Sequence, residues 1–165
     1  AMALFNKGVA LGEAGKSEEA IAAYDEVVRR FGDSGETALL EQVAKAFNGK
    51  AFRRLIMAKA SLQSPDNENE AKPLLSQALA DAEMGLEITS EDSMLLGNKG
   101  YALFLLQGEE KAEPILRRAL ELGGEERRDA ELEDAGINPL PQDEAFKELI
   151  NRLWDEVSAE KNDKT

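Results

Sequence analysis

Apolar residues recur at the three- and four-residue spacing of an α-helix along nearly the whole chain. Leu4, Gly8 and Leu11 share one face of a first helix. The same spacing predicts further helices around 20–28, over 36–60, up to about 88, over 93–107 and 109–122, and from about 146 to 157. No segment alternates with the two-residue period of a β-strand. The pattern therefore predicts an all-α fold of seven or eight helices.

Glycines and short polar runs separate the first helices. Gly15 is expected to end the first helix and Ser17 to cap the second, which the glycine-rich run 32–35 ends. The stretch 61–69 is rich in Ser, Pro, Asp and Asn, so it predicts a loop. Each break joins two neighbouring helices, as expected for a series of helical hairpins.

Prolines and a glycine pair set the boundaries in the second half of the chain. Pro73 is compatible with a helix if it lies in the first turn, and Pro114 is expected to kink its helix or delay its start. Gly124, after another glycine, should stop that helix, and the Asn-Pro-Leu-Pro run 138–141 is expected to be a rigid connector. The tail 160–165 is expected to be frayed.

Composition narrows the function classes. The chain of 165 residues has 33 acidic and 20 basic residues, a net charge of −13, and neither cysteine nor histidine. These counts exclude disulfides, thiolate zinc sites, cysteine nucleophiles and Ser-His-Asp triads. The acidity disfavours nucleic acid and anionic lipid as partners. No apolar run reaches the roughly 20 residues of a membrane span, and no signal peptide opens the chain, so we expect a soluble, cytoplasmic protein.

A short motif recurs three times. Residues 4–8 read Leu-Phe-Asn-Lys-Gly and residues 96–100 read Leu-Gly-Asn-Lys-Gly, with a divergent copy, Ala-Phe-Asn-Gly-Lys, at 46–50. In the first and third copies the motif's glycine lies 12 residues before an alanine of the next helix. The second helix of the middle copy carries Ala78, Ala82 and Gly85 at the corresponding spacing. The asparagines of the three copies are 42 and 50 residues apart, which predicts insertions around the middle copy.

The motif and its spacing resemble the tetratricopeptide repeat, a helix-turn-helix unit of about 34 residues. The first copy matches the pattern of this family at Gly8, Leu11, Gly15, Ala20, Tyr24 and Val27. Small residues such as Gly8 and Ala20 let two helices cross closely, and large ones such as Tyr24 fill the space beside them. The resemblance covers residues 1–124.

This resemblance implies a right-handed α-solenoid of about three helical hairpins with a C-terminal capping helix. We place the hairpins at approximately 1–34, 36–90 and 93–124, and the capping helices at 125–159. An open-ended stack of repeats needs such a cap because its last repeat would otherwise expose an apolar face.

Two segments resemble ligand loops but lack what the chemistry requires. Residues 10–17 fit a relaxed phosphate-loop pattern, yet they continue an amphipathic helix and follow no strand, so a helix–helix turn with Lys16 in solvent is expected. Residues 66–70 are acidic, but a calcium loop also needs Gly at its sixth position and Glu at its twelfth. The charge run 125–128 is expected to be a solvated helix face. We therefore predict no catalysis, no cofactor and no metal, the alternative being an enzyme that relies on carboxylates alone.

The asparagines of the three motif copies, Asn6, Asn48 and Asn98, occupy equivalent places on the first helix of each hairpin. The family resemblance implies that these helices line a concave groove and that an asparagine ladder there grips an extended peptide. An amide side chain suits this role because it both donates to and accepts from a peptide group. The alternative is that the amides brace a neighbouring helix or loop.

Apolar residues near these asparagines are candidate anchors for a bound peptide. They are Phe5, Val9, Tyr101 and Phe104. The alternative for them is the core between repeats. The resulting functional prediction is a protein–protein interaction scaffold whose groove binds a neutral or basic peptide. The alternative is a self-associating structural module, with its groove filled by another subunit of a homo-oligomer or by its own chain.

Overall fold

The computed structural model describes residues 1–162. Its helices are α1 (Met2–Glu13), α2 (Ser17–Phe31), α3 (Thr37–Leu62), the short 3-10 helix η1 (Pro65–Asn67), α4 (Glu68–Ile88), α5 (Ser93–Gln107), α6 (Glu109–Ala135) and α7 (Asp143–Asn162). These residues contain no strand, which confirms the all-α prediction. None of the helices in this part of the chain is long and apolar enough to cross a membrane.

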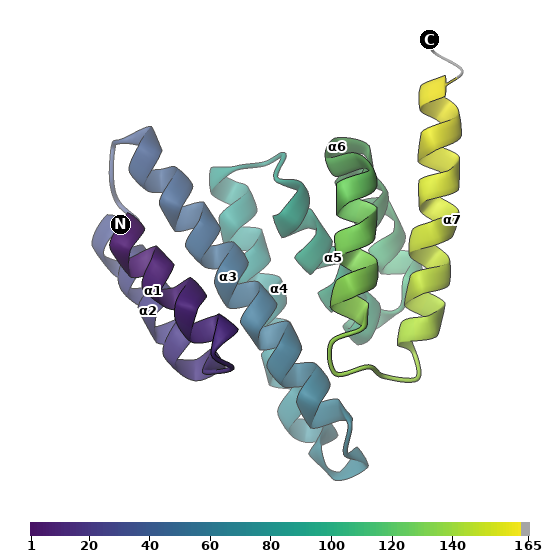
Figure 1. Ribbon diagram of the computed structural model, residues 1–165, viewed down its shortest axis with the longest axis horizontal. Helices are drawn as coiled ribbons and strands as arrows, with labels where there is room; N and C mark the ends of the chain where they lie inside the picture. Colours follow the sequence, from purple (N-terminus) through teal and green to yellow (C-terminus); the bar gives the residue numbers. More distant parts are fainter. Residues whose placement is uncertain (163–165) are drawn as a thin grey trace.

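The helices stack as a row of antiparallel hairpins (Figure 1). α1 pairs with α2, and α3 with α4. Gly124 has φ +63° and ψ −150°, so it breaks α6 into a first part, 109–123, that pairs with α5 and a second part, 125–135, that is followed by α7. α1 also contacts α3, and α3 contacts α5. The first helices of successive hairpins therefore lie next to one another, and we call the surface that they form the α1–α3–α5 face.

The segment after Gly124 repeats the burial pattern of the preceding hairpin. Three positions of the first part of α6 are fully buried, and so are the three positions of α7 that follow them by 34 residues. The two sets are Ala112, Leu116 and Ala119, and Phe146, Ile150 and Leu153. Since 34 residues is the period of the resembled family, α7 occupies the place of the second helix in a further hairpin.

Several predicted boundaries change in the structure. Ser17 is the first residue of α2 rather than its cap, since Lys16 holds the cap position without a capping side-chain bond. The stretch 61–69 is only partly loop, because α3 runs to Leu62 and α4 begins at Glu68. Pro73 therefore lies beyond the first turn of α4.

The predicted effect of Pro114 is also wrong. The helix starts before this proline, at Glu109, and Gly124 is the residue where helical geometry is lost. α7 continues to Asn162, so residues 160–162 are helical, and residues 163–165 of the predicted tail lie outside the described part of the chain.

The first core forms around Tyr24, which is 3% exposed and lies between two glycines. A Cβ atom on Gly8 would lie 2.5 Å from Cε1 of this ring, and one on Gly49 would lie 2.6 Å from Cε2 on its other edge. Both distances are shorter than carbon atoms tolerate, so α1 and α3 can approach α2 this closely only because both positions are glycine.

Gly8→Ala is therefore expected to destabilise the protein by about 1 kcal/mol, because overpacking outweighs the gain in helix propensity. Urea denaturation would measure this effect. Gly35→Ala is the control, since Gly35 has open space around its Cα and should change stability by less than about 0.5 kcal/mol. A Gly8→Ala protein as stable as the wild type would contradict the close packing of Tyr24.

Candidate protein-binding face

The three predicted asparagines lie on α1, α3 and α5, in different surroundings. Asn6 is exposed, whereas Asn48 and Asn98 are half-buried. The Nδ2 group of Asn98 donates a hydrogen bond to Oδ1 of Asn48 at 2.8 Å. This bond is the bracing interaction for these two residues. It leaves the amide group of Asn48 and the carbonyl oxygen of Asn98 for another partner.

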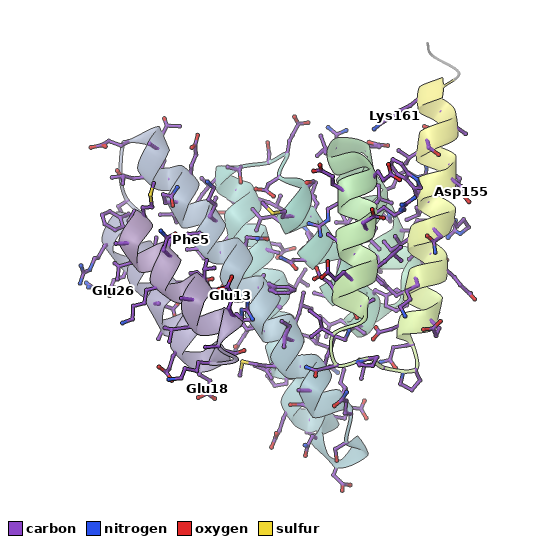
Figure 2. All side chains as sticks on the ribbon, viewed as in Figure 1. Phe5, Glu13, Glu18, Glu26, Asp155 and Lys161 are labelled. Atoms are coloured by element: carbon purple, nitrogen blue, oxygen red, sulfur yellow. The ribbon has the colours of Figure 1, made fainter. Side chains whose placement is uncertain are left out.

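The predicted anchors on α1 lie partly in the first core. Phe5 and Val9 are both half-buried. The ring centroid of Phe5 lies 5.6 Å from that of Tyr24, with 43° between the ring planes. Figure 2 shows Phe5 and Glu13 toward opposite ends of α1. Phe5 therefore packs against the first core with one part of its side chain and exposes the rest.

The predicted anchors on α5 turn toward α7. Tyr101 is 3% exposed, and its ring stacks on Phe146 with 4.3 Å between centroids. Its hydroxyl donates to Oδ1 of Asp143 at 2.5 Å. Burial, followed by this hydrogen bond to a carboxylate, raises the pKa of Tyr101. Phe104 meets the Phe146 ring edge-on at 5.2 Å. Both side chains pack in the core, the alternative that the sequence left open for them.

Lys59 is a buried cation that the sequence analysis missed. Its side chain is 2% exposed, and its Nζ atom lies 3.0 Å from Oδ2 of Asp143. Nζ also donates to the backbone oxygens of Asp134 and Ala135 at 3.2 and 3.0 Å. These oxygens belong to the C-terminus of α6, where carbonyl groups lack helical partners. Burial lowers the pKa of Lys59, and the Asp143 carboxylate opposes this shift. Lys59 thus connects α3 to the end of α6 and the start of α7.

A second buried ion pair lies within the second part of α6, where it packs on α5. Glu131 is 2% exposed, and its Oε1 atom lies 3.1 Å from Nε of Arg127. Glu131 lies directly over Gly97, where a Cβ atom would collide with its carboxylate. Burial raises the pKa of Glu131 to about 7, and Arg127 opposes this rise. Burial likewise raises the pKa of Asp134 to about 6. The predicted solvated face at 125–128 is wrong for Arg127, whose side chain is only 10% exposed.

These contacts close the α1–α3–α5 face above the middle of α5. A cavity of about 10 Å³ remains there, lined by Phe52, Leu55, Ile56, Lys59, Asn98, Tyr101 and Asp134. That volume is at the lower limit for a single water molecule. The Nδ2 group of Asn138 donates to the backbone oxygen of Ile56 at 3.2 Å, which attaches the loop after α6 to α3. The cavity above α5 is too small to admit a peptide.

Three of the basic residues of α3, Lys50, Arg54 and Lys59, pair with carboxylates of other helices. α3 carries five basic residues and one acidic residue. Nζ of Lys50 lies 2.7 Å from Oδ1 of Asp25 and 3.1 Å from Oδ1 of Asp81, which Arg54 also contacts. Exposed carboxylates lie at both ends of the stack, on α2 and on α7 (Figure 2). Within residues 1–162, no group of three or more carboxylates is arranged to hold a metal ion.

Comparison with known proteins supports the resemblance seen in the sequence. The family model of the tetratricopeptide repeat matches residues 1–33, which are α1, α2 and the turn between them. Comparisons with curated proteins and with solved structures found no match. The resemblance to this family is thereby confirmed for the first hairpin.

Proposed function

Since the first hairpin is a tetratricopeptide repeat, a unit that generally mediates protein–protein interaction, we propose that this chain is an interaction scaffold without catalysis of its own. Its ligand is a neutral or basic peptide segment, and it acts in the cytoplasm. The repeats are 1–34, 36–90 and 93–124, and residues 125–159 cap them as a final hairpin. The peptide lies along the α1–α3–α5 face beside Asn6 and Asn48.

The contact between Asn48 and Asn98 carries this proposal. Equivalent positions of two repeats meet on adjacent first helices, at a half-exposed place on the face. Each amide keeps a hydrogen-bonding group beyond the one used in their shared bond, and Asn6 is fully available on α1. Phe5 and Val9 add the exposed parts of their side chains for apolar contact. Tyr101 and Phe104 support the face from the core.

Peptide arrays probed with the wild-type protein and with Asn6→Ala and Asn48→Ala would test this function. One lost hydrogen bond corresponds to a roughly two- to tenfold weaker signal on the same peptides. Asn151→Ala is the matched control, because Asn151 is an exposed asparagine of α7, a helix that does not belong to the α1–α3–α5 face. Unchanged binding by both test variants would refute the asparagine ladder.

A second candidate function is supported by the closed cavity above α5. The second part of α6 and the Asn138 loop lie where the groove would continue along α5. This arrangement supports the alternative in which the groove is filled by the protein's own chain. In that case the stack is a structural module. The same arrays separate the two functions, because a purely structural module would bind no peptide on which Asn48→Ala has an effect.

A further inference from the structure

A hollow of about 450 Å³ opens where α6 breaks at Gly124. It lies between the start of α5 and the two parts of α6. Its lining includes Met94, Leu122, Gly123, Glu126, Arg127 and Ala130. We call it the kink hollow. It is far larger than the closed cavity above α5, and the volume suits a large side chain.

Exposed apolar side chains line the kink hollow. Among the described residues, four large hydrophobic side chains are exposed. Two of them, Met94 at 46% and Leu122 at 36%, line this one hollow. The other two are Met2 and Met84. Exposed apolar side chains that cluster in a concave place mark binding surfaces, and methionine adapts its shape to different apolar partners.

The rim of the hollow favours a positively charged partner. Glu126 is exposed on the rim. The arginine of the lining is already compensated, because Arg127 pairs with Glu131. Residues 109–162 contain 16 acidic and 8 basic residues, so the surroundings are negative as well. Apolar walls with an acidic rim complement an apolar side chain flanked by cations.

We propose that the kink hollow binds one large apolar side chain of a partner peptide whose neighbouring residues are lysine or arginine. The inference rests on the proposed function, because it names the anchor and charge of the peptide bound there. Met94 precedes Asn98 by one helical turn, so the two residues share a face of α5. Asn98 lines the closed cavity above the middle of α5, so the anchored peptide lies beside the start of α5 and ends before that cavity.

Fluorescence anisotropy with a designed probe tests this inference. The probe is a labelled decapeptide of glycine and serine with a central leucine and two lysines on each side of it. We expect the peptide with serine in place of leucine to bind at least about fivefold more weakly. The peptide with glutamate in place of lysine should not bind, and added salt should weaken the leucine peptide.

Variants of the protein locate the site. Met94→Gln should weaken binding of the leucine probe about fivefold, and Glu126→Gln about twofold. Met84→Gln is the matched control, because Met84 is 47% exposed on α4 and does not line the hollow. Equal weakening by Met84→Gln and Met94→Gln, or equal binding of the leucine and serine peptides, would overturn the proposal. Self-association that depends on Met94 would also overturn the proposal, because the occupant of the hollow would then be a second copy of the chain. Light scattering would show it as a molecular mass that rises with protein concentration for the wild type but not for Met94→Gln.

The same titration separates this inference from the proposed function. If Asn48→Ala weakens binding and Met94→Gln does not, the hollow is not the anchor and the interaction face stands. If Met94→Gln weakens binding and Asn48→Ala does not, the hollow binds the probe without the asparagine ladder. If neither variant has an effect, both proposals fail.

Discussion

Lys59→Met is expected to lower the free energy of unfolding by about 3 to 5 kcal/mol. The substitution leaves the Asp143 carboxylate, which is 1% exposed, without its cation. It also removes the donor to the backbone oxygens of Asp134 and Ala135 at the end of α6. The Asp143 carboxylate then keeps only neutral donors, the Tyr101 hydroxyl and the Leu140 N–H group, and the backbone oxygen of Ala135 loses its donor. A buried charge without its cation is among the costliest changes a folded chain can undergo. Urea denaturation followed by circular dichroism would measure the loss.

Lys45→Met is the matched control for this experiment. Lys45 is exposed on the same helix, so its replacement should change stability by less than about 0.5 kcal/mol. Adding Asp143→Asn to Lys59→Met removes the uncompensated charge. The double variant should therefore lose less stability than the sum of the two single variants, by about 1 kcal/mol or more. Equal losses for Lys59→Met and Lys45→Met would show that the buried network does not hold α3, α6 and α7 together.

The sequence predicted the helices well because local signals define them. Apolar spacing located the seven helices, and positions such as Gly8 and Tyr24 meet as the repeat pattern requires. Local signals were weaker at Pro73 and Pro114. A proline removes one backbone donor, but packing of the helix on its neighbours outweighs that loss, so α4 and α6 extend on both sides of it.

The site was harder to predict because its partners are distant in the sequence. The polar partners of Lys59 lie at least 75 positions further along the chain. In the sequence alone, Lys59 looks like an ordinary charged residue of a helix. Glu131 likewise belongs to a charged segment that reads as solvated, yet it packs over Gly97. Tyr101 fits both a groove anchor and a core residue until Phe146 and Asp143 of α7 are placed beside it.

The long middle hairpin explains why the face above α5 is closed. α3 has 26 residues, whereas α1 has 12, and the additional turns carry Ile56 and Lys59 to the end of α6. The spacing of the asparagines predicted insertions around this hairpin, but it did not indicate which helices the inserted residues contact. In the structure they bridge α3 to the last helices, which leaves only the small cavity above the middle of α5.

Raising the pH from 5 to 8 is expected to lower the free energy of unfolding by about 2.5 kcal/mol through Glu131 alone. Each pH unit over which only the native state holds the proton contributes about 1.4 kcal/mol. Burial raises the pKa of Glu131 from 4.5 to about 7 in the folded protein. Between these values the native state keeps a proton that the unfolded chain has released. The contribution of this group to stability is therefore complete below about pH 4.5, falls between pH 4.5 and pH 7, and is lost above about pH 7.

Glu131→Gln isolates this effect, because the amide is neutral at every pH and has nearly the same shape. Between pH 5 and pH 8, the free energy of unfolding of the variant should rise by about 2.5 kcal/mol relative to that of the wild type. Urea denaturation at intermediate pH values would measure this change. Asp134, whose pKa burial raises to about 6, is present in both proteins, so the difference between them reports on Glu131. Glu110→Gln is the control, since Glu110 is exposed in the first part of the same helix and its difference from the wild type should be nearly constant with pH. A difference between Glu131→Gln and the wild type that is equally constant would mean that Glu131 is ionised in the folded protein throughout, with its cost of burial fully offset by Arg127.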